Sequence, residues 1–410
     1  MRTPLVFVST ALLLLVGCRQ TGDIPLEYDP PGSTVTTTKE ITPQKKRAIG
    51  FHKSGVWVSN EFDGARLNDF YQTGEASYTA VIQPENAPIN NSAWYAFKIW
   101  AQPVQTIEIR LTYEDGDHRY VPKLSRDGAA FAPLDAASYV HDTTDGTATL
   151  RLNVGPDTLW VAAQELITST TFARWMDDLA RHPYVTQRVV GRSTQGRPLR
   201  MIEITEADDP AGYVLVISRQ HPPEVTGTLA ALPFLETLAA ESDLARAFRQ
   251  RFAVMAVPLM NPDGVDNGHW RHNTGGVDLN RDWLHFNQPE GRQVSEVFLD
   301  LKDDAPVFFG IDFHSTQEDV FYTLSRDLET EPPGFIDAWL DKIRAAFPDY
   351  YVNDDPSGLG SPVSKNWFYE TFNAPAVTYE VGDESDRALI RRLSTGAAEA
   401  MMELLLAEVE

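Results

Sequence analysis

The sequence VLVISRQHPPE at residues 214–224 joins an apolar run directly to His221 and Glu224. The apolar residues predict a buried strand, and the turn after such a strand can direct an imidazole and a carboxylate toward one point. His and Glu together are a common pair of zinc ligands. A His-x-x-Glu spacing also occurs by chance in chains of this length, so it indicates a metal site only if other segments support it.

Several other segments support it. The apolar run at residues 308–313 leads into DFHST (312–316), and TYEVG (378–382) follows a third run, so His314 and Glu380 also lie at the ends of predicted strands. Open α/β sheets bind ligands at the carboxyl ends of neighbouring strands. Between them, NPDG (261–264) and HWRHNTGGVDLNRDW (269–283) form a loop that we expect to be too polar for the core. GRSTQGRPL (191–199) predicts a tight hairpin turn.

Two domains are expected from the length of the chain. Residues 47–167 contain short alternating runs between turn-rich pieces, which predicts an antiparallel β-sandwich with strands at 78–82, 94–100, 106–113, 147–154 and 158–163. Residues 168–410 alternate helical patterns with apolar strand-like runs. This pattern predicts an α/β domain with a mixed, largely parallel sheet flanked by helices.

The first residues, MRTPLVFVSTALLLLVGC, have the features of a targeting segment: a positive charge at Arg2 and an apolar stretch too short to span a bilayer. The ending LVGC resembles the lipobox of bacterial lipoproteins. We therefore expect residues 1–18 to be a lipoprotein signal peptide with lipidation at Cys18, the alternative being a plain secretory signal. Arg19 then favours the outer membrane by the sorting rule of that class. Residues 19–46 are polar, which predicts a flexible tether.

Composition excludes two classes of function. The chain carries 35 Lys and Arg against 58 Asp and Glu, a formal net charge of −23, and no basic run offsets it. Such a surface repels phosphate backbones, so nucleic-acid binding is not expected. Cys18 is the only cysteine. A metal must therefore be bound by His and carboxylate side chains, and a cysteine-rich zinc module is excluded.

Taken together in this order, the segments around His221, His314 and Glu380 resemble the zinc metallocarboxypeptidases of the carboxypeptidase A clan, and within them the cytosolic-carboxypeptidase-like branch, which has a β-sandwich before the catalytic domain. The resemblance implies a single zinc ion and assigns the residues to three roles. The metal ligands are His221, Glu224 and His314; the catalytic residues are Glu380 as general base and Arg271 at the oxyanion; and Asn280 and Arg281 bind the substrate's terminal carboxylate.

Three positions depart from the family or extend it. The family's tyrosine before the general base has no clear counterpart, since Gly358 lies in that stretch and Tyr350 and Tyr351 lie further upstream. Ser315-Thr316 replaces the usual Ser-Tyr. Lys365 stands where the family lines the pocket for the substrate's last side chain, so it either selects an acidic side chain or is an ordinary solvated lysine.

The resulting hypothesis is a zinc carboxypeptidase that hydrolyses C-terminal bonds of peptides or peptidoglycan-derived peptides at the bacterial cell envelope, held there by a lipid anchor. Two alternatives remain open. One is a zinc amidohydrolase acting on cell-wall peptides or N-acyl amino acids. The other is a non-catalytic surface binding protein, against which the general base and the arginines argue, because a binding module needs no general base.

Overall fold

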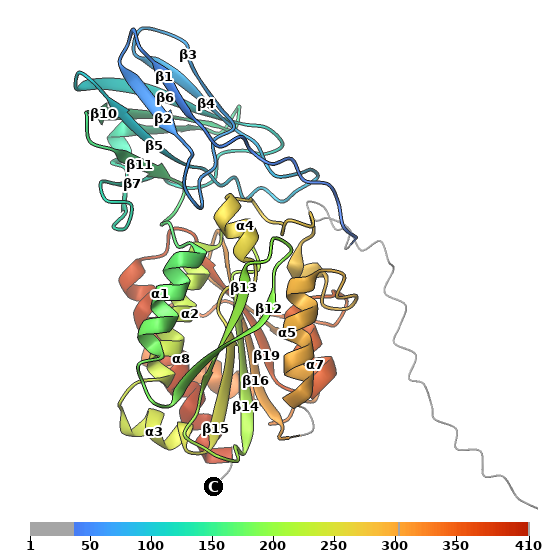
Figure 1. The fold of residues 1–410 in the computed structure, drawn as a ribbon. Coiled ribbons are helices and arrows are strands. Elements are labelled where there is room, and N and C mark those ends of the chain that lie inside the picture. Colours follow the sequence, from blue (N-terminus) through green and yellow to red (C-terminus); the bar gives the residue numbers. More distant parts are fainter. Residues whose placement is uncertain (1–36, 302–303, 409–410) are drawn as a thin grey trace, which may run out of the picture.

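The computed structural model describes residues 37–301 and 304–408, which form two domains stacked end to end (Figure 1). The predicted signal peptide, Cys18 and residues 19–36 of the predicted tether lie outside the described residues. Within the described ranges, no helix is long and apolar enough to cross a membrane.

The N-terminal domain is a β-sandwich, as expected. One sheet has the strand order β1-β2-β5-β11-β7-β8 and the other β3-β4-β6-β10-β9. The bounds are β1 (Ala48–Phe51), β2 (Val56–Ser59), β3 (Asp69–Gln72), β4 (Ser77–Ile82), β5 (Ala96–Ala101), β6 (Gln105–Tyr113), β7 (Lys123–Ser125), β8 (Ala132–Pro133), β9 (Tyr139–Asp142), β10 (Thr147–Val154) and β11 (Leu159–Ala162), with a 3₁₀ turn at Ala136–Ser138. Along β6, Ile107, Ile109 and Leu111 are buried and alternate with exposed residues, which is the pattern of a strand with one face on the core.

One pairing in this sandwich differs from the expected antiparallel arrangement. Strand β4 pairs with β6 in parallel, with Ser77 opposite Glu108 and Ile82 opposite Tyr113. Between these two strands the chain passes through β5, which belongs to the other sheet. Because the chain crosses to the other sheet and back, β6 can run in the same direction as β4. A short hairpin between the two strands would make them antiparallel.

The C-terminal domain is built on one eight-stranded sheet of order β12-β13-β15-β14-β16-β19-β17-β18. The bounds are β12 (Val185–Arg192), β13 (Pro198–Ile204), β14 (Gly212–Ser218), β15 (Phe252–Val257), β16 (Val307–Thr316), β17 (Val320–Leu324), β18 (Asp354–Ser357) and β19 (Ala376–Gly382). The central strands β15, β14, β16 and β19 are mutually parallel, and the antiparallel pairs lie toward the edges. Every residue of β14 is buried. Burial on both faces explains its continuous apolar run.

Helices cover both faces of this sheet (Figure 1). Their bounds are α1 (Ser169–Leu179), α2 (Val225–Leu238), α3 (Asp243–Arg249), α4 (Pro262–Asn267), α5 (Pro289–Asp300), α6 (Phe335–Ala346), α7 (Ser364–Phe372) and α8 (Arg387–Glu408), with a 3₁₀ turn η2 (Leu279–Arg281). Alternate residues of β14 belong to different cores. Val214 and Val216 pack in the core shared with α1, α2, α3, α6 and α8, whereas Leu215 packs in the core shared with α5 and α7.

The segment just before β1 packs against both domains, although it falls within the expected tether. The Lys39 backbone N–H donates to Gly275 O at 2.8 Å, and the Thr42 N–H donates to Glu85 O at 2.6 Å. Gln44 Nε2 donates to carbonyls of both domains, at Ala65 and Asn267. The contacts of this segment with the folded body therefore begin before residue 47.

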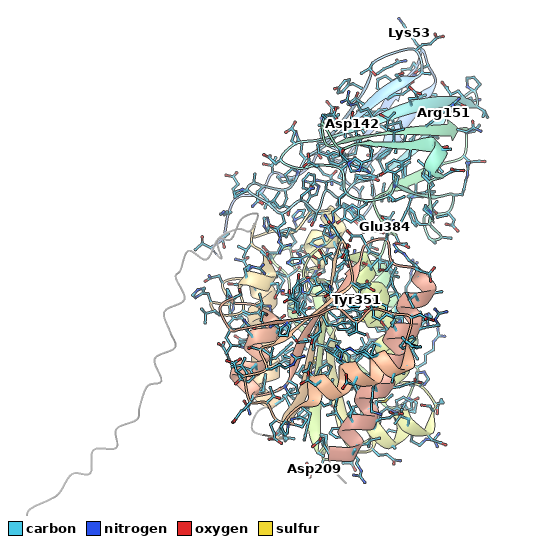
Figure 2. The ribbon with its side chains drawn as sticks, turned by 180° about the vertical axis from the view of Figure 1, so that it is seen from behind. Lys53, Asp142, Arg151, Asp209, Tyr351 and Glu384 are labelled. Carbon is cyan, nitrogen blue, oxygen red and sulfur yellow. The ribbon has the colours of Figure 1, made fainter. Side chains whose placement is uncertain are left out.

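The loop at residues 269–283 is buried, and here the expectation that it lies outside the core was wrong. Trp270 is fully buried and belongs to the hydrophobic core of the sandwich. The polar residues of the loop bond to one another and to the N-terminal domain, which removes the cost of burying them. On another part of the junction, Lys123 Nζ lies 3.1 Å from a carboxylate oxygen of Glu384, which Figure 2 shows between the two domains.

Candidate active site

The turn after β14 positions the first two candidate ligands. Arg219 follows the strand with a positive φ of 57°, a backbone conformation that non-glycine residues rarely adopt. Its buried guanidinium donates from Nε to Pro222 O and from Nη1 to Thr228 Oγ1, both at 2.9 Å. The turn is thereby fixed between the strand and α2, with His221 in the turn and Glu224 immediately before the helix.

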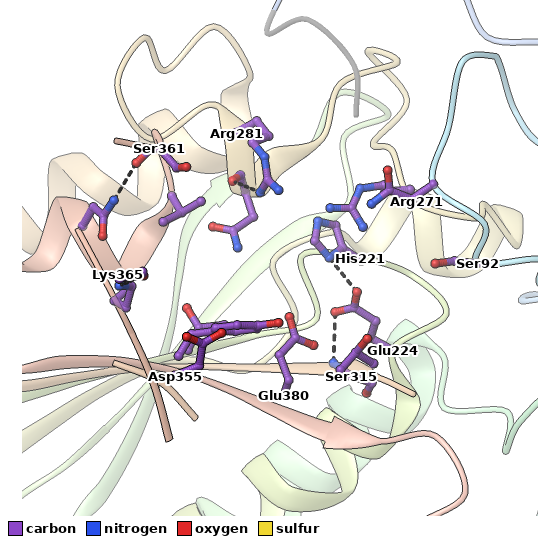
Figure 3. Close-up of a pocket in the computed structure, with 18 of the residues that line it drawn as sticks. Ser92, His221, Glu224, Arg271, Arg281, Ser315, Asp355, Ser361, Lys365 and Glu380 are labelled. Atoms are coloured by element: carbon purple, nitrogen blue, oxygen red, sulfur yellow. Dashed lines mark hydrogen bonds and ion pairs between the residues drawn. The ribbon is translucent and has the colours of Figure 1, made fainter. Parts of the chain in front are cut away.

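Three buried side chains converge in this region, His221 and Glu224 from the turn and His314 from β16; Figure 3 shows the first two. Glu224 Oε1 lies 2.8 Å from His221 Nδ1, and Glu224 Oε2 lies 2.6 Å from His314 Nδ1. The two Nδ1 atoms are 3.2 Å apart. Two nitrogen ligands of one tetrahedral zinc ion, each about 2.1 Å from it, lie about 3.4 Å from one another, so this spacing suits a shared ion.

The opposite nitrogen of each histidine faces a buried carboxylate. His221 Nε2 lies 2.7 Å from Asp278 Oδ1, and His314 Nε2 lies 2.8 Å from Asp312 Oδ2. A carboxylate accepts hydrogen bonds, so each ring can donate to its carboxylate through Nε2 and offer Nδ1 to a metal ion. Both Nδ1 atoms and the Glu224 carboxylate converge on one point. Such a ligand set fits a divalent cation such as zinc.

Close packing brings α2 against β16. A Cβ atom added to Gly227 would lie 2.4 Å from His314 O, so a larger residue has no room there. Ser315 Oγ accepts a hydrogen bond from the Gly227 backbone N–H at 2.7 Å. This contact fixes the helix that follows Glu224 relative to the strand that carries His314.

Glu380 lies on β19 directly opposite His314 on β16. Figure 3 shows its carboxylate pointing into the cavity beside Glu224. Its Oε2 has no hydrogen-bond partner among the described residues. Burial, followed by the Glu224 carboxylate, raises the pKa of Glu380 to about 7. A buried carboxylate with a free oxygen and a pKa near neutrality suits a general base.

His221, Glu224 and Glu380 line one cavity of about 420 Å³. Both domains contribute to its wall. Asn90, Ser92 and Arg119 come from the sandwich, and the catalytic domain supplies His221, Glu224, Arg271, Asn280, Arg281, Ser315, Thr316, Tyr322, Asp355, Ser357, Gly358, Ser361, Val363, Lys365, Asn366, Thr378 and Glu380.

Comparisons with known proteins identify the family. The family model described as Zinc carboxypeptidase matches residues 172–394, more than half of the chain. The chain belongs to the zinc carboxypeptidase family. It is therefore a zinc-dependent peptide hydrolase, and His221, Glu224 and His314 form a site that can hold the zinc ion.

Two solved structures share the fold of this zinc carboxypeptidase. A metallo-carboxypeptidase from Burkholderia cenocepacia is 18% identical with a TM-score of 0.73, over 87% of this chain and 99% of that one. A metallo-carboxypeptidase from Pseudomonas aeruginosa, in complex with (2-guanidinoethylmercapto)succinic acid, is 20% identical with a TM-score of 0.68. That match covers 85% of this chain and 98% of the Pseudomonas chain. Both alignments include most of this chain, so the similarity covers the sandwich as well as the catalytic domain.

Sequence relatives match over different lengths. An uncharacterized protein of Zymomonas mobilis is 25% identical over 79% of this chain and 87% of its own length. Cytosolic carboxypeptidase 6 of Mus musculus is 27% identical over 36% of this chain, and the match covers 30% of the mouse protein. The match between this carboxypeptidase and the mouse protein is therefore confined to part of each chain.

The other residues expected in the site of this carboxypeptidase also lie in the cavity wall. Arg271 Nε donates to Asp278 Oδ2 at 2.7 Å, so Asp278 contacts both this arginine and His221. Asn280 accepts at Oδ1 from the Ser364 backbone N–H. Arg281 Nη1 donates to Asn280 O at 2.9 Å, while its Nε has no partner among the described residues.

Lys365 lies in the first turn of α7 and is 2% exposed, so it is not a solvated lysine. Its Nζ donates to Thr323 O and Ser357 Oγ, both at 2.9 Å. Burial lowers its pKa to about 8, which the nearby Asp355 only partly offsets. An ammonium group with two neutral acceptors retains a third hydrogen to donate.

Sequence reasoning missed several residues of the site. Asp312 has a signal in the sequence, because residues two apart on a strand point to the same side and Asp312 precedes His314 by two. Asp278 has none, because its contact depends on the path of a loop. The tyrosine of the cavity wall is Tyr322; Tyr350 instead bonds Asp319 at 2.9 Å, and Tyr351 is 81% exposed.

Proposed function

We propose that this protein removes single residues from the free C-terminus of peptides. The observation that carries the proposal is the position of Arg281, which lines the same cavity as Glu380 and the metal-ligand candidates His221 and Glu224. Its Nε has no hydrogen-bond partner among the described residues. An arginine can bind a carboxylate with two parallel hydrogen bonds. Such an anchor beside a hydrolytic centre favours the last peptide bond of a chain.

The proposed mechanism gives each side chain one task. Zinc held by His221, Glu224 and His314 supplies Lewis-acid chemistry, which acidifies water and polarises a carbonyl. Glu380 accepts a proton at its free oxygen from the attacking water and donates it to the leaving amine.

The two arginines act on the substrate. Arg271, fixed through Nε by Asp278, presents its remaining N–H groups to the oxyanion that develops during attack. Arg281 and Asn280 bind the terminal carboxylate, which aligns the last peptide bond with the reacting groups.

The buried ammonium of Lys365 supports a preference for an acidic last side chain. It lines the same cavity and has one hydrogen that neither Thr323 nor Ser357 accepts. A carboxylate on the substrate would pair with it in a site of low dielectric, where such pairs are stronger than in water.

A peptide library varied at its last residue tests both proposals. We expect release of single C-terminal residues with Asp and Glu enriched, and we expect Lys365→Met to lose that enrichment while it still releases apolar residues. Lys342→Met is a matched control, because Lys342 pairs with Glu403 at a distance from the cavity. An unchanged profile in Lys365→Met would contradict the selector role, and cleavage of N-acyl amino acids without release from peptides would favour an amidohydrolase.

We also propose that the protein acts at the cell envelope, anchored through a lipid on Cys18. The lipobox-like ending of residues 1–18 supports this proposal. Expression of the full chain in a two-membrane bacterium should place it in the outer-membrane fraction, and Cys18→Ser should release it from that fraction. Equal fractionation of both forms would contradict the anchor.

A further inference from the structure

The N-terminal sandwich supplies a buried carboxylate to the loop that carries Arg271. Glu85 lies in the segment after β4 and is fully buried. Its Oε2 accepts from the Trp270 backbone N–H at 2.7 Å. Its Oε1 accepts from the backbone N–H groups of Arg271 at 3.1 Å and His272 at 2.7 Å. Three consecutive peptide groups of one domain are thus held by one side chain of the other.

The residues on either side of Arg271 are also fixed on the sandwich. The Trp270 indole donates from Nε1 to Trp94 O at 3.0 Å, and its ring packs in the sandwich core. His272 Nδ1 lies 2.6 Å from Asn86 Oδ1. Arg271 therefore extends toward the catalytic domain from a backbone whose position is set by the N-terminal domain.

The other end of Arg271 reaches the metal-binding cluster. Its Nε bonds Asp278 Oδ2, and the other oxygen of Asp278 bonds His221. A continuous series of hydrogen bonds thus runs from Glu85 through the Arg271 peptide and side chain to a metal ligand. A guanidinium that stabilises an oxyanion must be held within a fraction of an ångström of its productive position.

The chemistry of the Glu85 site requires a carboxylate. Burial alone would raise the pKa of Glu85, but His269, His272 and Arg66, together with the backbone donors, lower it to about 2. Three N–H donors converge on its two oxygens, and a carboxylate accepts at both. The amide of a glutamine would turn one NH₂ group toward an N–H and leave a buried donor unpaired.

We propose that Glu85 is a positioning residue for Arg271, so that catalysis by the C-terminal domain depends on a carboxylate of the N-terminal sandwich. This inference rests on the proposed function, because it assigns Arg271 to the oxyanion. It gives the sandwich a role in the reaction itself, acting through the backbone of residues 270–272 without touching the substrate.

The variant Glu85→Gln tests the inference in the zinc-loaded full chain. We expect kcat to fall about 100-fold, the size of effect that a displacement of about 1 Å can have, with KM changed less than about threefold and zinc content unchanged. Lys123→Met is the matched control, because it breaks an interdomain ion pair between a buried lysine and the more exposed Glu384, and Lys123 is not a partner of the 270–272 backbone. We expect its kcat to match that of the wild type. An equal loss of kcat in Lys123→Met would assign the effect to the domain junction in general and overturn the inference.

A double-mutant cycle separates positioning from a merely structural role. If Glu85 acts through Arg271, Glu85→Gln should have no further effect on kcat once Arg271→Ala is present. The inference would be overturned if Glu85→Gln lowered kcat by the same factor with and without Arg271→Ala, or if Glu85→Gln alone left kcat unchanged.

Should Glu85→Gln fail to fold, Glu85→Asp replaces it in the cycle, since it keeps the charge and shifts only the acceptor. If the wild type releases no C-terminal residue, the proposed function and this inference are both contradicted. If the wild type is active but Glu85→Gln and Arg271→Ala lower kcat independently of one another, only the inference is contradicted.

Discussion

At the scale of single residues, the candidate metal site is defined as much by the carboxylates behind the histidines as by the ligands. Asp278 and Asp312 each occupy the Nε2 side of a ligand histidine, and this leaves both Nδ1 atoms directed at Glu224. The ligands were predicted from motif order. Asp278 was not, because it lies 57 positions from His221 in the sequence, and the path of the loop that carries it cannot be read from a local pattern.

Asp278→Ala should weaken zinc binding and catalysis together. It removes the acceptor that orients His221 and the partner of Arg271 Nε, and loss of such a supporting carboxylate typically costs about 10–100-fold in metal affinity. Competition with a fluorescent chelator measures the affinity. Asp319→Ala, which removes a carboxylate of the same domain that bonds Tyr350, provides a comparison. Unchanged zinc affinity in Asp278→Ala would show that His221 needs no such support.

The pH dependence of kcat/KM should report Glu380. A general base works when deprotonated, so activity is retained above its pKa and falls about tenfold per pH unit below it. Burial, followed by Glu224, raises that pKa to about 7, and the positive charge of zinc on the cluster lowers it. We therefore expect an acidic limb with its midpoint at or below pH 7 in a pH–rate profile. A rate that rises as the pH falls from 7 to 5 is incompatible with this role.

At the scale of elements, strands with strong patterns were predicted well and polar edge strands were not. Strand β10 matches its predicted bounds at residues 147–154, because its buried and exposed residues alternate. Strand β18 has the sequence DDPS and is mostly exposed at the edge of the sheet. Asp and Pro disfavour strands, so neither composition nor periodicity indicates it, and only its pairing with β17 creates it.

Gly227→Ala tests the close approach of α2 to β16. The new methyl group would lie 2.4 Å from His314 O and must push the helix and the strand apart. We expect a loss of about 1–3 kcal/mol in the free energy of unfolding, measured with denaturant, and weaker zinc binding. Gly360→Ala is the control, because nothing lies within 4 Å of its added methyl group. Equal stability of the two variants would contradict the packing argument.

At the scale of the whole molecule, the two domains were predicted from the sequence, but the contacts that join them were not. The hydrogen bond from the Trp270 N–H to Glu85 joins residues 185 positions apart, and no local pattern in either segment announces it. The polar loop at 269–283 therefore appeared unsuitable for a core. Its burial follows only once the carboxylate and carbonyl groups of the sandwich are brought against it.

Because Trp270 fills the sandwich core from the catalytic domain, we expect both domains to unfold in a single transition in scanning calorimetry. Trp270→Ala should lower the stability of that transition by roughly 3–5 kcal/mol, the usual cost of removing a large buried aromatic side chain. Two well-separated transitions in the wild type would show that the domains are independent. A fragment of residues 168–410 that remained folded and active would contradict the same account.

The most direct test of the central claim is mass spectrometry of one defined peptide, with a free or an amidated C-terminus, incubated with the zinc-loaded protein. The account predicts stepwise loss of single residues from the free peptide, little or none from the amidated peptide, and none when Glu380→Gln or a chelated sample replaces the enzyme. It further predicts that Glu380→Gln still binds zinc, because Glu380 is not one of the three ligands. Equal cleavage of both peptides, internal cleavage, or full activity of Glu380→Gln would contradict the assignment of a metallocarboxypeptidase centre to this cavity.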